Sequence, residues 1–159
     1  AGEVRSQGVE FEVQGAITPS WQVAAGYTVA IARYRKDATA SNVGALFDTD
    51  TPRHLFKLST MYRLPGDLQR WRIGGSVYRQ GFIYNKGTTS GVPFNITQNA
   101  YAVADLVVGW QATQKLDLRL NINNVFDKKY YNALSGSVGF PSNVYGEPRN
   151  VMLSARYQF

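Results

Sequence analysis

The stretch LDLRLNIN, from Leu116 to Asn123, alternates apolar and polar residues without a break. Its apolar positions are Leu116, Leu118, Leu120 and Ile122, and charged or amide side chains fill the positions between them. A period of two is typical of a β-strand that has one face against apolar surroundings and the other against water. The stretch therefore predicts a strand.

Working outward in both directions, six further segments show the same period. They lie at residues 9–14, 21–31, 55–62, 71–78, 104–111 and 150–159. The apolar faces carry no charge, and the charges on the opposite faces are Glu10, Glu12, Lys57, Arg72, Asp105, Asp117, Arg119 and Arg156. An Arg or Lys that faces lipid at mid-membrane costs about 2–4 kcal/mol, whereas a wet lumen accepts it. The pattern predicts an all-β chain, an antiparallel transmembrane β-barrel with one side of each strand toward lipid.

The connections between these strands alternate in length. Short ones lie at 18–20, 64–70 and 113–115, and long ones at 33–52, 83–100 and 126–148. Outer-membrane barrels have short periplasmic turns and long extracellular loops, so strands one, three, five and seven are expected to run toward the periplasm. Bacterial single-chain barrels have an even number of strands, from eight upward. We therefore expect residues 1–159 to be the C-terminal part of a longer polypeptide and not to fold alone.

Aromatic residues provide a separate test of this orientation. Six of them fall at the periplasmic ends of the apolar faces: Trp21, Tyr62, Trp71, Trp110, Tyr157 and Phe159. Amphipathic rings are most stable between hydrocarbon and headgroups, so a membrane girdle is expected there. The alternative is that these rings are core aromatics of a soluble β-protein, such as a ligand-binding calyx.

Composition excludes several functions. The 159 residues include no cysteine and one histidine, which excludes a disulfide framework, a cysteine nucleophile and a histidine-rich zinc site. No Ser-His-Asp set and no acid pair at catalytic spacing is found, so neither an enzyme nor a metal site is expected. The net charge of +6 arises partly from basic residues of the predicted outer loops, namely Arg33, Arg35, Lys36, Lys128 and Lys129. We expect them to contact lipopolysaccharide phosphates, with no role for nucleic acid.

Four segments resemble a known family. LNINNVFDKKYY at 120–131 and the terminal YGEPRNVMLSARYQF at 145–159 resemble the C-terminal end of TonB-dependent outer-membrane receptors. TPRHLFKLSTMYRLPGD at 51–67 and WRIGGSVYRQG at 71–81 look like the ferric-siderophore branch, which includes coprogen, pyoverdine and ferrioxamine receptors. The resemblance covers essentially the whole chain. It implies the bacterial outer membrane and a 22-stranded barrel plugged by an N-terminal domain, which residues 1–159 lack.

The resemblance also implies a function. A ferric siderophore is captured outside the cell and imported when TonB pulls on the plug, and iron is present only within that ligand, with no other cofactor. The apolar last strand ending at Phe159 resembles the signal read by the barrel-assembly machinery. A passive porin or a substrate-specific channel stays open as the alternative, because it would share the alternation and need no plug.

Candidate ligand contacts come from the outer half of the lumen face and from the long loops. Ferric siderophores are bulky and polar, so aromatic rings with a polar edge suit them. The candidates are Tyr78, Tyr84, Phe140, Tyr145, Tyr130 and Phe94. For each, the alternative is packing within the loops or a place in the upper aromatic girdle. Gly136, Gly139 and Gly146 give the last loop either the mobility to close over a ligand or mere flexibility.

Polar residues of the lumen face are candidates for contacts with the plug or with one another. The set is Glu10, Glu12, Lys57, Arg72, Asp117, Arg119, Asn121 and Asn123. Two roles stay open for the charged members of this set. They can attract an anionic ligand, or they can pair across the wall, as Arg119 would with Asp105 or Asp117. The asparagines, together with Asn124, either bridge lumen groups or plug backbone, or form a turn before Phe126 and Asp127.

Overall fold

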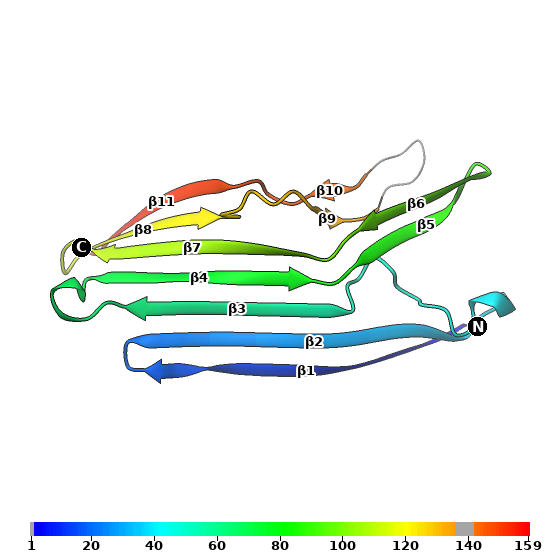
Figure 1. Ribbon diagram of the computed structural model, residues 1–159, viewed down its shortest axis with the longest axis horizontal. Coiled ribbons are helices and arrows are strands. Elements are labelled where there is room, and N and C mark those ends of the chain that lie inside the picture. The colour runs from blue at the N-terminus through cyan, green and yellow to red at the C-terminus, as the bar shows by residue number, and fades with distance from the viewer. Residues whose placement is uncertain (1, 136–141) are drawn as a thin grey trace.

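The computed structural model describes residues 2–135 and 142–159, and its main element is an antiparallel sheet of seven strands (Figure 1). The strands follow one another across the sheet in the order β1-β2-β3-β4-β7-β8-β11. Their bounds are β1 Glu3–Thr18, β2 Trp21–Lys36, β3 His54–Arg63, β4 Trp71–Gln80, β7 Tyr101–Gln111, β8 Leu116–Asn123 and β11 Asn150–Tyr157. The predicted all-β architecture is confirmed, and each predicted strand is present.

The long connections contain strands that were not predicted from the sequence. Two small sheets lie in them, formed by β5 Ile83–Thr89 with β6 Val92–Gln98 and by β9 Tyr131–Ala133 with β10 Val144–Tyr145. The prediction of 83–100 as a loop is therefore wrong. Ser90 and Gly91 join β5 to β6 with φ of 50° and 79°, the positive values that match a two-residue turn to the twist of its strands.

β1 and β2 extend beyond their predicted bounds. β1 begins at Glu3 and β2 continues to Lys36, so the long connection begins after residue 36 and not at residue 33. Arg5 pairs with Arg33 in the regular register of this hairpin. The extension carries polar residues on both faces, and the alternation that marks the rest of the strand is therefore lost there.

In residues 2–135 and 142–159, helical structure is limited to two 3-10 turns. They are η1 at Ala40–Asn42, in the connection between β2 and β3, and η2 at Gly66–Leu68, in the connection between β3 and β4. In the described part of the chain, no helix is long and apolar enough to cross a membrane.

The register sorts the side chains onto two faces as predicted. On one face, apolar residues lie opposite each other across neighbouring strands, for example Leu58 with Val77 and Val108 with Leu120. Large apolar side chains on this face are exposed, including Phe11 at 68% and Leu153 at 71%. An exposed apolar surface of this extent is unusual in a water-soluble monomer. It is expected where the surrounding solvent is hydrocarbon.

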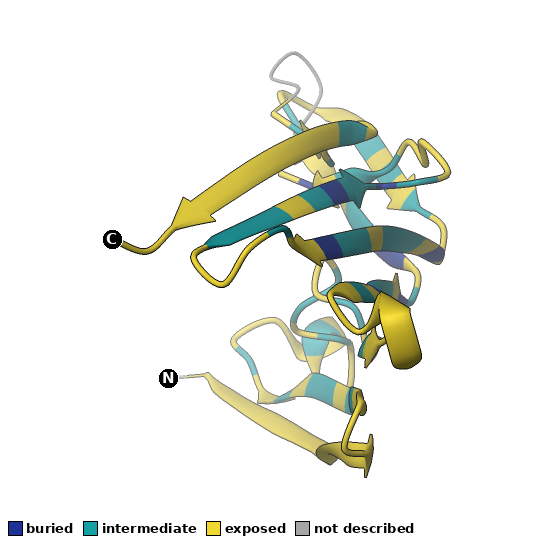
Figure 2. Cartoon of the chain, turned by 90° about the vertical axis from the view of Figure 1, so that its left-hand side faces the viewer, coloured by how far each residue is buried: buried dark blue, intermediate teal, exposed yellow. Residues whose placement is uncertain are grey.

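The buried core lies away from the middle of the sheet. Among the described residues, the buried hydrophobic side chains are Ile83, Tyr101 and Leu134, all near the end where the long connections lie. Seen from the opposite end, the strands form an arc (Figure 2). The sheet thus has the shape of a wall with a compact cap at one end.

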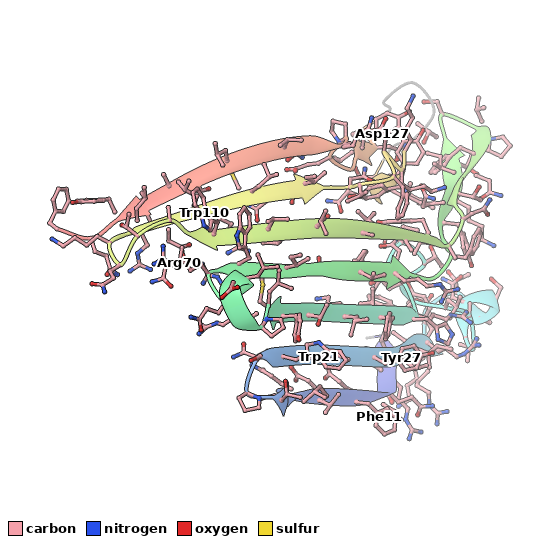
Figure 3. All side chains as sticks on the ribbon, turned by 60° about the vertical axis from the view of Figure 1, so that its left-hand side comes forward. Phe11, Trp21, Tyr27, Arg70, Trp110 and Asp127 are labelled. Atoms are coloured by element: carbon pink, nitrogen blue, oxygen red, sulfur yellow. The ribbon has the colours of Figure 1, made fainter. Side chains whose placement is uncertain are left out.

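Aromatic residues mark the short-turn end of the apolar face. Trp71 lies opposite Trp110, and their rings stack with centroids 5.4 Å apart and an interplanar angle of 13°. Trp21 lies opposite Tyr62, and its Nε1 donates a hydrogen bond of 2.8 Å to Thr60 Oγ1. Trp21 and Trp110 can be followed in Figure 3. The location of these rings at a membrane interface stays a prediction.

Adjacent valines on β7 test the assignment of the two faces. Val108→Arg, which we expect to face lipid, should lower the free energy of unfolding of the full-length receptor in bilayers by about 2–4 kcal/mol. Val107→Arg places the same side chain on the lumen face and should cost less than about 1 kcal/mol, because the charge stays hydrated. Denaturant titration of both variants measures the difference. Equal losses for the two valines would contradict the assignment.

Candidate functional site

An ion pair on the lumen face joins β4 to β8 across the strand between them, β7. Arg72 Nη2 on β4 contacts Asp117 Oδ2 on β8, although β7 lies between these two strands. The residue beneath the pair is Gly109, where a Cβ atom would lie 3.2 Å from Arg72 Nε. Glycine at this position therefore leaves the room that the guanidinium needs to reach across the strand.

The sequence-based partner of Arg119 is wrong. Neither Asp105 nor Asp117 forms a salt bridge with Arg119 within residues 2–135 and 142–159; instead Arg119 Nε donates to Asn121 Oδ1 at 3.0 Å. Asp117 forms its ion pair with Arg72 on β4. Asp105 accepts hydrogen bonds from Ser76 Oγ at 2.7 Å and from the backbone N–H of Asn124 at 2.9 Å. Charged side chains therefore do pair within the wall, but their partners differ from those predicted for Arg119.

Two hollows lie along the lumen face. One of about 600 Å³ is lined in part by Glu10, Glu12, Lys57 and Tyr78, and one of about 530 Å³ by residues that include Arg119. Glu10 Oε1 accepts a hydrogen bond of 3.3 Å from the Thr28 hydroxyl on the neighbouring strand, a wall contact that leaves its second oxygen available. Plug contacts of these side chains stay predictions.

Asn124 fixes the segment that follows β8. It is 2% exposed and has a φ of 49°, a left-handed conformation that asparagine tolerates better than most residues. Its Nδ2 donates to the carbonyl oxygens of Lys128 and Glu147, both at 2.9 Å, and its Oδ1 accepts from the Lys128 N–H at 2.8 Å. One side chain therefore joins the loop after β8 to the loop before β11.

Neighbouring residues extend this turn. Asp127, labelled in Figure 3, has a φ of 51°, and its Oδ1 accepts from the Arg149 N–H at 3.0 Å. Asn123 Nδ2 donates to Asn150 Oδ1 at 2.7 Å. Of the two roles left open by the sequence, turn formation is present for Asn124. Asn121 and Asn123 each bond to another residue of the wall, Arg119 and Asn150, and contact with a plug stays a prediction for both.

Three tyrosines gather at the outer end of the lumen face. Tyr101 begins β7, and its ring lies 6.2 Å from Tyr78 and 4.3 Å from Tyr130, measured between centroids. The Tyr130 ring lies directly against Gly146, where any Cβ atom would overlap it. Gly146 is therefore required for close packing of this ring, a role that the sequence-based proposal of loop mobility did not include. We call these rings the tyrosine cluster (Tyr78, Tyr101 and Tyr130).

Polar groups beneath the tyrosine cluster are only partly satisfied. The Tyr78 hydroxyl donates to Gln80 Oε1 at 2.9 Å, whereas Gln80 Nε2 and the Tyr101 hydroxyl are buried without a partner. Burial, and then the charges of Glu147 and Asp105, raise the pKa of Tyr130 above its ordinary value. The Tyr130 hydroxyl thus keeps its proton near neutral pH and can donate a hydrogen bond.

The remaining candidate ligand residues lie in other groups. Tyr84 lies 5.8 Å from Phe82 between ring centroids and lines a hollow of about 400 Å³ beside the connection from β2 to β3. The rings of Tyr145 and Tyr131 lie 4.7 Å apart between centroids and are tilted by 34°. Phe94 packs over Gly87 across the β5–β6 hairpin. Phe140, Gly136 and Gly139 lie outside the described residues.

The structure thus joins two of the candidates through a residue that the sequence analysis missed. Tyr78 and Tyr130 both contact Tyr101. Tyr101 lies on the same face as Asp105, two alternations earlier along β7. Extending the period of two back from Asp105 would therefore have identified it.

Comparison with known proteins agrees with this architecture. The family described as TonB dependent receptor-like, beta-barrel matches residues 1–125. The ferric-pyoverdine M114 receptor PbuA of Pseudomonas sp. (strain M114) is 37% identical over 159 residues, which cover 100% of this chain and 19% of that receptor. The catecholate siderophore receptor Fiu of Escherichia coli (strain K12) is 32% identical over 158 residues, which cover 99% of this chain and 20% of Fiu.

A solved structure gives the same result. The ferripyoverdine receptor of the outer membrane of Pseudomonas aeruginosa, bound to ferripyoverdine, matches with a TM-score of 0.86 and 35% identity over 99% of this chain and 20% of that one. The chain belongs to the TonB-dependent receptor β-barrel family. It is accordingly an outer-membrane protein and not an enzyme, as predicted. It spans about a fifth of the length of the relatives it matches.

Replacement of Asn124 tests the turn. Asn124→Ala removes three side-chain hydrogen bonds and leaves buried backbone groups unpaired, at a cost of about 1–3 kcal/mol for each such group. Amides of residues 125–131 in the full-length receptor should then exchange with deuterium about tenfold faster or more. Asn95→Ala, at an exposed position of β6, is the matched control and should leave exchange in this segment unchanged. Unchanged exchange in both variants would contradict the role of Asn124.

The unpaired hydroxyl of Tyr101 gives a prediction of opposite sign. Tyr101→Phe removes a buried group that has no partner, so the melting temperature should stay the same or rise. Tyr78→Phe removes a hydrogen bond to Gln80 and should cost about 1 kcal/mol. Thermal unfolding of the two variants compares these effects directly. A larger loss for Tyr101→Phe than for Tyr78→Phe would mean that the Tyr101 hydroxyl has a partner.

Proposed function

We propose that residues 1–159 form the C-terminal part of the wall of a receptor that imports a ferric siderophore across the outer membrane with energy supplied through TonB. The single observation that carries the proposal is the tyrosine cluster at the outer end of the lumen face, on a chain whose matched relatives are named ferric-pyoverdine and catecholate siderophore receptors.

The tyrosine cluster has the chemistry that a ferric siderophore requires. Aromatic faces supply large contact area at low entropic cost, and hydroxyl groups supply directional hydrogen bonds. The Tyr130 hydroxyl is protonated near neutral pH, as a tyrosine ordinarily is, and burial raises its pKa further, so it can donate to an oxygen of the ligand. A siderophore already fills the coordination sphere of its iron, and the described residues contain no group of three or more His, Asp or Glu that could hold a metal ion.

The wall also supports an energy-coupled receptor over a passive channel. In this proposal, the hollows beside Glu12, Lys57 and Arg119 receive a plug domain that connects to TonB. The side chains of Glu12, Lys57 and Arg119 are exposed. They can exchange water for plug groups at low cost, because neither state buries an isolated charge. The barrel-assembly machinery and lipopolysaccharide complete the set of proposed partners.

Growth and conductance distinguish the receptor from a porin. A strain that depends on the full-length receptor should grow with ferripyoverdine as its iron source only when TonB is present. In planar bilayers the same protein should show no steady conductance, because the plug closes the barrel. A steadily open pore, or uptake that persists without TonB, would refute the proposal in favour of a passive channel.

The tyrosine cluster predicts an affinity change. Tyr78→Ala/Tyr130→Ala in the full-length receptor should weaken ferripyoverdine binding by about tenfold or more, since each aromatic contact is worth about 1 kcal/mol beyond its area. Tyr62→Ala, at the short-turn end of the apolar face, removes an aromatic ring far from the cluster and should leave affinity unchanged. Intrinsic fluorescence quenching measures both constants. Equal affinities for the two variants would remove the cluster from the binding site.

A further inference from the structure

Two tyrosines face each other across the small sheet of β9 and β10. Tyr131 begins β9 and Tyr145 ends β10, and the two residues are partners in the antiparallel register. Their rings lie 4.7 Å apart between centroids with a tilt of 34°, and their hydroxyl oxygens lie 3.2 Å apart. The two phenol groups therefore meet at their hydroxyl ends.

This pair of phenols is open to solution. The Tyr145 side chain is 67% exposed, Tyr131 is half-buried, and the hydrogen bond between their hydroxyls lies at the surface. The sheet of β9 and β10 lies at the end of the wall where the long connections gather (Figure 1). A reagent dissolved in water can therefore reach both rings.

Hydrogen bonds hold the two strands together on both sides of the pair. On one side, the Gly146 N–H donates to the Tyr130 carbonyl oxygen at 2.9 Å. On the other side, Ser135 Oγ donates to the Ser142 carbonyl oxygen at 2.8 Å, and Ser142 Oγ donates to the Ser135 carbonyl oxygen at 2.9 Å. Groups that are held in contact in this way react far faster than groups that must first meet by diffusion.

Among the ring contacts of residues 2–135 and 142–159, no other joins two accessible tyrosines. Tyr101 stacks on Tyr130 and lies near Tyr78, but Tyr101 is 4% exposed and its hydroxyl is buried. The other ring contacts of a tyrosine join it to a histidine or a phenylalanine, and these tyrosines are Tyr27, Tyr34, Tyr84 and Tyr157. Contact between two phenols and access from water thus coincide at one place.

We propose that Tyr131 and Tyr145 form a site of oxidative modification, at which hydrogen peroxide and a peroxidase join the two rings into a dityrosine. Each phenol loses one electron and its hydroxyl proton, and hydrogen peroxide takes up both electrons and both protons to become two water molecules. The two phenoxyl radicals form a carbon–carbon bond between ring carbons ortho to the oxygens. The hydrogens on those carbons then move to the phenol oxygens, and both rings become aromatic again.

The new bond closes residues 131–145 into a covalent loop. A cross-link removes the open conformations of the chain that it joins. In the oxidised protein β9 and β10 cannot separate, and the neighbouring contact between Tyr130 and Gly146 is held in place. The modification goes beyond siderophore uptake and does not depend on it.

The test treats the full-length receptor in detergent with a haem peroxidase and limiting hydrogen peroxide, followed by tryptic digestion and mass spectrometry. Trypsin cleaves after Lys129 and Arg149, so both tyrosines lie in one peptide of residues 130–149. In the wild type, this peptide should lose two hydrogen atoms and show the fluorescence of dityrosine. It should also give no fragment ions from backbone breaks between Tyr131 and Tyr145, because the cross-link holds the pieces together.

Variants and a peptide control separate the outcomes. Tyr131→Phe and Tyr145→Phe should each lose the cross-link, whereas Tyr130→Phe, in the same peptide, should keep it. A synthetic peptide of residues 130–149 should form the cross-link at least about tenfold more slowly, because its rings are not held in contact. Equal rates in the receptor and the peptide overturn the proposal. So do an unmodified peptide in the wild type, a cross-link that persists in Tyr131→Phe, and dityrosine found only between separate receptor molecules.

Discussion

The antiparallel register of the seven-stranded sheet is the constraint on which the other features depend. Side chains alternate along each strand, so a slip of one residue would exchange the lipid-facing and lumen-facing sets. Several contacts tie particular positions together. Trp71 stacks on Trp110 across one strand pair, and Gly75 brings β4 so close to the Asp105 carbonyl that no side chain fits there. The chemistry of both faces follows from this register.

The two ends of the sheet differ in the residues that they carry and in the contacts that these residues make. At the short-turn end, aromatic rings cover the apolar face and the lumen face carries the ion pair of Arg72 with Asp117. At the other end, the connections fold back on the wall and bury Tyr101 and Asn124. Buried polar contacts are thus concentrated where the proposed ligand binds. The middle of the wall has to face hydrocarbon on one side, which limits it to apolar residues there.

Much of the wall could be predicted from the sequence because burial in lipid imposes a period of two. The lumen cross-link could not be predicted in the same way: Arg72 reaches Asp117 two strands away only because Gly109 leaves a gap between them. The role of Asn124 depends on a positive φ and on loops that are distant in sequence. The β5–β6 hairpin was missed because β5, with the sequence IYNKGTT, shows no apolar alternation, and the short alternation of Val92, Phe94 and Ile96 on β6 was overlooked. Tyr101, by contrast, could have been predicted, because the period of two that marks β7 extends back from Asp105 to this residue.

The most direct test measures the environment of successive positions along β7. Residues 1–159 contain no cysteine, so single cysteines at 104 to 109 in the full-length receptor give an unambiguous set of labelling sites within this segment. Spin labels at the even positions, including Val108, should be broadened by oxygen dissolved in the bilayer, and those at the odd positions, including Val107, by a water-soluble nickel complex. A strict alternation is the predicted result. Uniform accessibility to the water-soluble reagent at all six positions would contradict the account.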